Sequence, residues 1–265
     1  MRYRTTNPED TSALTALWLN CFEEKREAAE SFFKRNINTY HGYAAENDGS
    51  IVAALYLLDA VLDGERAHYL CGAATRRDCR NRGVMTALIR FALDDARARG
   101  DVYSLLLPAD EGLYRFYARL GYEATCTAFS REFTCGEARQ TPRGEADTDR
   151  LQRVRMRNKF LFWNNNQIRF AEEYYGCYGV KSLESEGAFA LYEQDGCEAE
   201  VFYAVFNDIE ELKRLLSARG VRRFNLTGGG ADPLFTGQPP LRCGMIKPLT
   251  DKKAPKGIYI GLTLS

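Results

Sequence analysis

The sequence lacks several features that would assign it to a binding class at once. Its 265 residues include 36 Lys or Arg and 36 Asp or Glu, so the formal net charge is zero. General nucleic-acid binders and polybasic membrane binders carry a basic surface, and we expect neither partner here. No apolar run approaches the roughly 20 residues that span a bilayer, and the first residues lack a charged-then-apolar leader pattern. We therefore expect a cytoplasmic protein.

Metal and disulfide chemistry also lack their usual signals. The eight cysteines are scattered without a CxxC pair, and the chain has only two histidines, His41 and His68. This pattern predicts reduced thiols that are mostly packed in the fold, and no structural metal site.

Apolar residues, in contrast, are plentiful. Hydrophobic residues make up 45% of the chain and aromatic residues 12%, which is enough for a real core and excludes wholesale disorder. The length favours two cores over one. Residues 134–149 read TCGEARQTPRGEADTD, rich in turn formers and charge. We therefore predict a first domain over 1–135, a linker over 136–149 and a second domain over 150–265.

Residues 1–135 alternate between strand and helix signals. We expect strands at 1–5, 43–46, 51–58, 67–75 and 102–107, and helices at 8–22, 28–34, 84–99 and 113–120. The strand, helix and strand between residues 67 and 107 imply a parallel pair joined by a right-handed crossover. The predicted fold class is therefore α/β (α+β) with a mixed sheet.

The second half repeats this order of elements. The turn Gln194-Asp195-Gly196 joins predicted strands at 189–193 and 197–206. A predicted helix at 208–216 follows, and then strands at 223–226 and 257–264. The shared order predicts a degenerate duplication.

The segment 73–86, AATRRDCRNRGVMT, is the strongest candidate for a binding site. A predicted strand ends there, a basic turn follows, and a helix begins. The first turn of a helix offers unpaired backbone amides and the positive end of the helix dipole, which together bind phosphate groups. Gly83 permits close approach to a ligand, while Arg80 and Arg82 add charge and Thr86 adds a hydroxyl. The alternative is a solvated basic turn in which the glycine serves only geometry.

This segment resembles the acetyl-CoA loop of the GNAT acyltransferase superfamily, whose pattern is Arg/Gln-x-x-Gly-x-Gly/Ala after a central strand. The chain has Arg80-x-x-Gly83-x-Met85, with Met in place of the last small residue. A second stretch, YRFYARLGY at 114–122, resembles the FYxxxGF segment of the same family. The resemblance covers approximately residues 1–135 and implies a GNAT acyl-CoA N-acyltransferase fold.

The resemblance also implies acetyl-CoA as the cosubstrate and no metal. Carried over to this sequence, the strand that pairs with the pantetheine arm falls on Ala73, Ala74 and Thr75. The phosphate-binding residues fall on Arg80, Asn81, Arg82, Gly83, Val84, Met85 and Thr86.

The family's general acid falls on Tyr117, four residues before Gly121. A phenol within reach of the sulfur can return a proton to the departing coenzyme A thiolate. The alternative for Tyr117 is a packing role beside Tyr114 and Phe116.

The two-copy arrangement resembles the enhanced-intracellular-survival type acetyltransferases, in which the C-terminal carboxylate reaches the active site. This resemblance implies a catalytic role for Ser265 and an acceptor-shaping role for the second domain. The stretch 68–72 lacks the glutamate that many relatives carry, and His68 is an alternative base by its usual pKa.

The second half has no matching phosphate loop. The equivalent stretch, FNDIEE at 206–211, is acidic and would repel a pyrophosphate. Gly228-Gly229-Gly230 leads to Asp232-Pro233 and is interpreted as a flexible turn. The aromatic residues of this half form either core packing or part of a substrate cleft; they are Phe160, Phe162, Trp163, Tyr174, Tyr175 and Tyr178.

Taken together, these features predict an N-acetyltransferase of tandem GNAT architecture. The acetyl group would pass from acetyl-CoA to a primary amine of a small molecule or peptide by direct attack. The alternative is a non-catalytic module that binds acyl-CoA. A homo-oligomer is compatible with either hypothesis.

Overall fold

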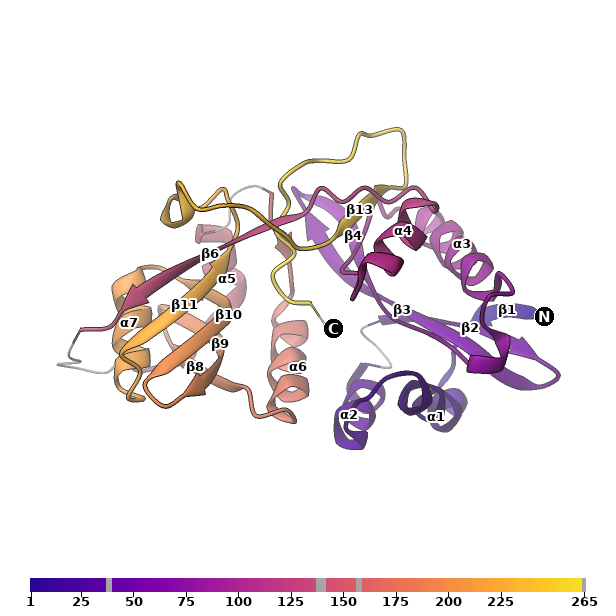
Figure 1. Ribbon diagram of the computed structural model, residues 1–265, viewed down its shortest axis with the longest axis horizontal. Helices are drawn as coiled ribbons and strands as arrows, with labels where there is room; N and C mark the ends of the chain where they lie inside the picture. Colours follow the sequence, from indigo (N-terminus) through magenta and orange to yellow (C-terminus); the bar gives the residue numbers. More distant parts are fainter. Residues whose placement is uncertain (37–39, 137–141, 156–158, 264–265) are drawn as a thin grey trace. The chain divides into compact units, whose positions relative to one another are not determined.

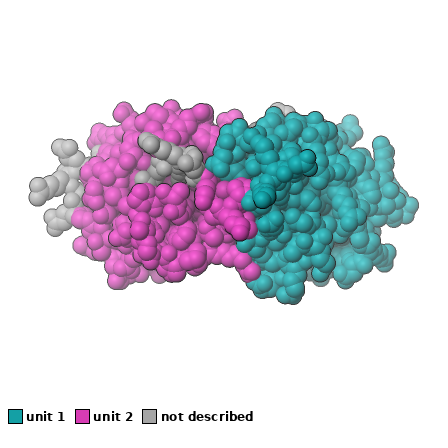
Figure 2. Space-filling model, turned by 90° about the horizontal axis from the view of Figure 1, so that it is seen from above, with its two compact units in different colours: residues 1–124, 244–254, 263–265 teal, residues 125–243, 255–262 magenta. Residues whose placement is uncertain are grey.

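Figure 1 shows the computed structural model, which covers residues 1–265 and describes all of them except 37–39, 137–141, 156–158 and 264–265. The chain forms two compact units, coloured separately in Figure 2. The first unit contains residues 1–124, 244–254 and 263–265, and the second contains residues 125–243 and 255–262. Each unit has its own sheet and its own hydrophobic core.

The first unit is built on a sheet with the strand order β1-β2-β3-β4-β5-β13. The strands are β1 (Arg2–Thr5), β2 (Tyr40–Asn47), β3 (Ser50–Leu62), β4 (Glu65–Thr75), β5 (Tyr103–Leu106) and β13 (Met245–Pro248). The helices are η1 (Pro8–Asp10), α1 (Thr11–Cys21), α2 (Arg26–Asn36), η2 (Arg77–Cys79), α3 (Val84–Ala98) and α4 (Glu111–Ala118). Along this order β4 and β5 are parallel and the other neighbours are antiparallel, which confirms the predicted crossover through α3.

Alternation along β3 distributes the helices over the two faces of this sheet. Leu55 and Leu57 belong to the core that contains the buried side of α3. Tyr56, between them, packs against Trp18 of α1 and Phe32 of α2, with ring centroids 5.8 and 5.0 Å away. Figure 1 shows the same division, with α3 and α4 on one side of the sheet and α1 and α2 on the other.

The second unit is built on a sheet with the order β12-β6-β11-β10-β9-β8. The strands of this sheet are β6 (Thr127–Thr134), β8 (Lys181–Ser185), β9 (Ala188–Asp195), β10 (Glu198–Phe206), β11 (Arg223–Gly228) and β12 (Leu241–Arg242). The two-residue strand β7 (Leu161–Phe162) belongs to this unit but not to this sheet. The helices are α5 (Thr148–Arg155), α6 (Asn165–Gly176), α7 (Ile209–Ser217) and η3 (Pro233–Phe235). The hairpin β9-β10, helix α7 and parallel strand β11 repeat the order β3-β4-α3-β5, as the duplication predicts.

The units differ from the predicted spans 1–135 and 150–265, because each contains a strand from the other's half of the sequence. β6 pairs with β11 of the second sheet, where Phe133 stacks on Phe224 with ring centroids 5.4 Å apart. β13 pairs with β5 of the first sheet and buries Met245 and Ile246. The predicted linker 136–149 also overlaps the first residues of α5. Both exchanged segments are short strands that complete a sheet at or near its edge, so their own sequences do not specify a partner.

The predicted strand at 257–264 is wrong for the residues that the structure describes. Ile258 and Tyr259 make single bridges to Cys126 and Phe160, and no continuous strand forms among residues 257–263. Gly257 and Gly261 have φ of 74° and 77°, a left-handed conformation that interrupts an extended chain. None of the helices in the described chain is long and apolar enough to cross a membrane.

Candidate functional site

The candidate site begins where β4 separates from β5. Their parallel pairing runs from Ala67↔Tyr103 to Tyr69↔Leu105, and no further pair follows in the described chain. On the other side, a bulge in β4 shifts its register with β3 between Ala74 and Cys71. The edge of β4 on the β5 side is therefore unpaired beyond Tyr69 in the described chain and is available to a ligand.

Gly72 makes this bulge possible. Its φ is +59°, and a Cβ built there would lie 2.3 Å from a ring carbon of Trp18. A glycine is required both by the left-handed backbone and by the close approach of the indole. Trp18 in turn donates from Nε1 to Oε2 of Glu24 at 2.7 Å, so this carboxylate is anchored to the ring that packs on the bulge.

The basic loop after β4 folds back on the end of that strand. Nε of Arg80 donates to the carbonyl oxygen of Thr75 at 2.9 Å. Nε of Arg76 lies 2.7 Å from Oδ1 of Asp78, which balances one of the loop's charges. Asn81 and Gly83 adopt positive φ of 60° and 76° and turn the chain into α3.

The first turn of α3 is open. Gly83 is the N-cap residue and makes no side-chain cap, while its carbonyl accepts the first helical bond from Ala87 at 3.0 Å. Among the described residues, no protein oxygen accepts from the backbone amides of Val84, Met85 or Thr86. Unpaired amides at the positive end of a helix dipole form an anion site.

These segments meet in a cavity of about 680 Å³. Every residue predicted to bind the cofactor lines it except Arg82, which is exposed. The lining residues from the predicted set are Ala73, Ala74, Thr75, Arg80, Asn81, Gly83, Val84, Met85 and Thr86. Tyr117 of α4 lines the same cavity, so the structure brings together the two motifs that are separated in the sequence.

Tyr117 combines packing with access to the cavity. Its side chain is 6% exposed, and its ring lies 5.1 Å from Phe116 and 5.7 Å from Tyr122 between centroids. The hydroxyl of Tyr122 is bonded to Ser104 at 2.6 Å, whereas the Tyr117 hydroxyl has no hydrogen bond within the described chain. Burial, and then the nearby Cys71 thiol, raise the pKa of Tyr117, so its phenol stays protonated at neutral pH.

Of the two candidate bases, the described residues include only His68, and it does not join this group. His68 is fully buried, its Nδ1 lies 2.7 Å from Oδ2 of Asp101, and it does not line the cavity. Burial lowers the pKa of His68 although Asp101 opposes the shift. Ser265 lies outside the described residues.

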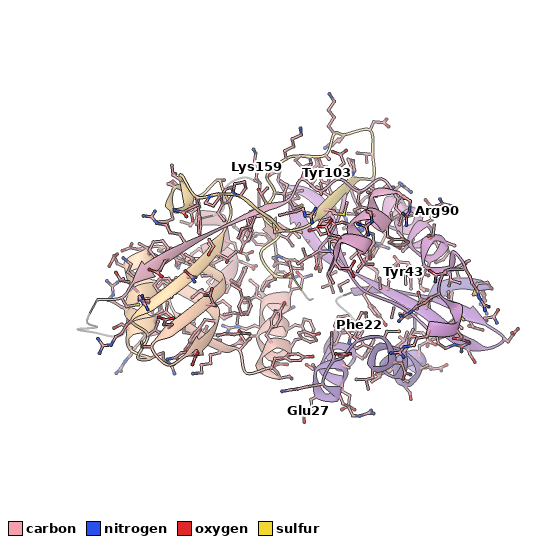
Figure 3. All side chains as sticks on the ribbon, in the orientation of Figure 1. Phe22, Glu27, Tyr43, Arg90, Tyr103 and Lys159 are labelled. Carbon is pink, nitrogen blue, oxygen red and sulfur yellow. The ribbon has the colours of Figure 1, made fainter. Side chains whose placement is uncertain are left out.

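Sequence reasoning missed the contribution of residues 21–24. Cys21 and Phe22 line the cavity directly, and Figure 3 labels Phe22 just after α1. Glu24 is half-buried, and its charge adds to burial in raising the pKa of the Cys71 thiol on β4. No motif marks these residues, because α1 reaches β4 only through tertiary packing.

Residues 2–125 match the family model described as the acetyltransferase (GNAT) domain. This part of the chain is a GNAT domain. Its class of activity is therefore acyl transfer. The comparison with curated proteins gave no match.

Solved structures extend the likeness in fold to the second unit. A GCN5-related N-acetyltransferase from Kribbella flavida is 18% identical with a TM-score of 0.65, over 93% of this chain and 69% of that one. Eis1 from Mycobacterium abscessus is 15% identical with a TM-score of 0.66, over 94% and 74%. A tandem GNAT protein from the clavulanic acid biosynthesis pathway is 12% identical with a TM-score of 0.51, over 95% and 99%. At these identities the likeness is one of fold.

The second unit has the GNAT-like order of elements but closes the corresponding helix terminus. Asp208 caps α7, and its side chain accepts from the amide of Glu210 at 3.1 Å. Glu211 in the same turn accepts a hydrogen bond from Ser185 at 2.5 Å. A capped, acidic helix terminus is unfavourable for phosphate, because its amides are occupied and its charge is negative.

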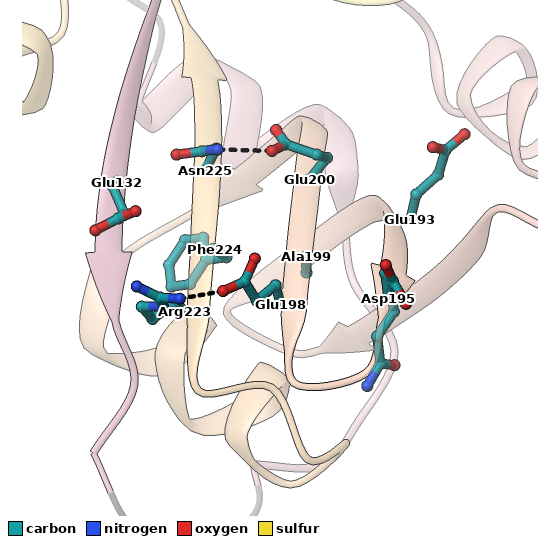
Figure 4. Close-up of a pocket in the computed structure, with 10 residues that line it drawn as sticks. Glu132, Glu193, Asp195, Glu198, Ala199, Glu200, Arg223, Phe224 and Asn225 are labelled. Carbon is teal, nitrogen blue, oxygen red and sulfur yellow. Dashed lines mark hydrogen bonds and ion pairs between the residues drawn. The ribbon is translucent and has the colours of Figure 1, made fainter.

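Acidic side chains also cover part of the second sheet (Figure 4). Glu132, Asn225, Glu200 and Glu193 lie in one register row across β6, β11, β10 and β9. Asn225 donates to Glu200 at 2.6 Å, and Arg223 forms an ion pair with Glu198 two register positions away. Carboxylates thus outnumber cations on this surface, in contrast to the loop before α3.

The aromatic residues of the second half are largely core, one of the two predicted alternatives. Trp163 is 2% exposed and donates from Nε1 to the carbonyl of Ile260 at 2.7 Å. Phe160 and Tyr174 are also buried, whereas Tyr178 is exposed.

Proposed function

We propose that the GNAT domain transfers an acetyl group from acetyl-CoA to a primary amine of a small molecule or peptide. The observation that carries the proposal is a single cavity that joins the open terminus of α3, the free edge of β4 and the Tyr117 side chain. An anion site, an extended backbone edge and a protonated phenol are the three features that binding and release of an acyl-CoA require.

Each part of the cavity has a defined role in this proposal. The amides of residues 84–86 bind the pyrophosphate, and Arg80 at the loop adds positive charge. The backbone at Ala73, Ala74 and Thr75 pairs with the pantetheine arm, which aligns the thioester beside the β4 bulge. Alignment of the thioester with the amine supplies much of the rate.

Tyr117 is the proposed general acid. The amine nitrogen forms a bond to the acetyl carbon, the bond from that carbon to sulfur breaks, and the phenol gives its proton to the departing thiolate. The raised pKa of Tyr117 keeps this proton in place at neutral pH until the thiolate develops.

Glu24 is the proposed proton acceptor for the attacking amine. It is held by Trp18 beside the β4 bulge, and its charge contributes to the raised pKa of the Cys71 thiol on that strand. A carboxylate near the acyl centre attracts an ammonium ion and can take its proton directly or through one water. The role predicted for Ser265 remains a prediction.

The test is release of coenzyme A, measured by chromatography, from acetyl-CoA with a panel of polyamines, aminoglycosides and peptide N-termini. Release that depends on a particular amine, with mass spectrometry of the acetylated product, supports the proposal. Tight coenzyme A binding without release across the whole panel would instead indicate the non-catalytic module.

A further inference from the structure

The second unit contains an opening at the same topological position as the acyl-CoA cavity of the first. The parallel pairing of β10 and β11 runs from Glu198↔Arg223 to Val201↔Leu226 and goes no further in the described residues. A cavity of about 410 Å³ lies at the carboxyl ends of these two strands. In open α/β sheets, ligands bind outside the carboxyl ends of the strands. The position is therefore one at which a ligand is expected.

Aromatic rings form the walls of this cavity. Phe206 comes from the end of β10, Phe235 from η3, and Phe160 and Tyr259 from two further segments. Ala204 and Leu226 add small and branched apolar surface. Four separate segments thus converge on one apolar space, as in small-molecule sites of this size.

Two glycines without side chains and the hydroxyl of Tyr259 fix the position of these rings. A Cβ on Gly228 would lie 2.3 Å from Phe235, and one on Gly229 would lie 3.0 Å from Tyr259. The hydroxyl of Tyr259 lies 3.3 Å from the carbonyls of Phe202 on β10 and Thr227 on β11. The glycine run, which the sequence suggested as a flexible turn, is therefore a close-packed surface beneath aromatic rings.

The charges around the cavity decide the class of ligand. Asp208 caps α7 directly after the end of β10, and Glu210 and Glu211 follow it, so a phosphate is excluded. Lys159 and Asp232 contribute one charge of each sign to the lining. We propose that this cavity is a second binding site, for an uncharged and largely apolar small molecule, and that it is independent of acetyl-CoA.

The test uses the full chain and N-phenyl-1-naphthylamine, a neutral fluorophore whose emission rises in apolar surroundings. Ala231 is exposed and lines the cavity, so Ala231→Trp places an indole at its mouth. Ala218 is another exposed alanine of the second unit that does not line the cavity, and Ala218→Trp is the matched control. Unfolding temperatures of both variants are measured first.

We expect saturable binding to the unaltered chain and to Ala218→Trp, with dissociation constants within twofold of each other. Ala231→Trp should bind one molecule fewer, or bind at least tenfold more weakly. Any fluorophore held by the first unit is retained in both variants and does not affect this difference. No saturable binding, or equal affinity and stoichiometry in the two variants, would overturn the proposal and leave the proposed acetyl transfer untouched.

Discussion

The two units place a crossover helix after the same kind of strand, but the helices begin in opposite ways. α3 begins after Gly83, a left-handed residue without a side chain, and its first amides are open. α7 begins after Asp208, whose carboxylate occupies its terminus, and two more acidic residues follow. One topology therefore leaves the first helical amides open in the first unit and caps them with a carboxylate in the second. The residue at the helix N-cap, more than the sheet, decides which ligand the position accepts.

The openings between the two parallel strands also differ between the units. In the first unit the opening between β4 and β5 carries an unpaired backbone edge and the protonated Tyr117. In the second, Tyr259 bridges the carbonyls of β10 and β11 across the corresponding opening. The first opening is suited to an extended polar ligand, and the second to a compact apolar one.

The largest effect on kcat should come from Tyr117→Phe, which removes the proposed proton donor from the cavity of the first unit. General acid catalysis contributes about 10²- to 10⁴-fold, so kcat should fall by that factor. Calorimetric titration should give a coenzyme A affinity within about twofold of the unaltered chain. Tyr122→Phe alters a neighbouring buried phenol that is bonded to Ser104, and serves as the matched control. Unchanged turnover in Tyr117→Phe would remove this residue from the mechanism.

Gly83→Asp should give the first unit the helix start of the second. The carboxylate would compete for the α3 amides and repel a pyrophosphate, so the KM for acetyl-CoA should rise at least tenfold. Gly100→Asp is the control, because Gly100 is also left-handed, with φ of 91°, and has open space at its Cβ position. Equal KM values for the two variants would mean that the α3 terminus does not bind the cofactor.

Glu24→Gln tests the carboxylate that Trp18 holds beside the opening of the first unit. Loss of a proton acceptor should lower kcat about tenfold to a hundredfold, measured as the initial rate of coenzyme A release at saturating acetyl-CoA. The neighbouring Glu23 is exposed, and Glu23→Gln should leave kcat unchanged. An unchanged kcat in Glu24→Gln would contradict the assignment.

The buried His68 should make stability depend on pH. Its pKa is lowered in the folded state, so below the unfolded value near 6.5 the unfolded chain binds a proton that the folded chain does not. Stability is therefore greatest above that pH and falls as the pH decreases towards the folded pKa, by at most about 1.4 kcal/mol per pH unit. Urea unfolding at pH 7.5 and 5.5 should show this loss, and His68→Gln should reduce it. An identical loss in the variant would assign the dependence to other groups.

The smallest effect concerns the acidic surface of the second sheet. Glu193 lies directly opposite Glu200 on neighbouring antiparallel strands, where like charges repel. Glu193→Lys should therefore raise the free energy of unfolding by about 0.2–1 kcal/mol, measured by urea denaturation at low ionic strength. The gain should shrink at high salt, and a gain independent of salt would point to another cause.

Much of the first unit could be predicted from local signals. The spacing of Leu88 on α3, the glycine before that helix and the strand that ends at Thr75 all lie within one continuous stretch, and local physical chemistry determines them. The exchanged strands could not be predicted in the same way. The chain around Phe133 has the pattern of a strand whichever sheet it joins, and its pairing depends on contacts with Phe224 that lie far along the sequence.

In the candidate site, too, local sequence determines some features and tertiary packing determines the others. The sequence by itself determined the open helix terminus at Gly83 and the acidic terminus at Asp208, because capping and φ preferences act within a few residues. It also placed Tyr117 at a fixed distance from Gly121. Only the tertiary structure decided that Tyr117 shares a cavity with the β4 edge, that Trp18 holds Glu24 beside that edge, and that His68 is buried against Asp101. These contacts join residues on separate elements, and packing selects them after the local elements have formed.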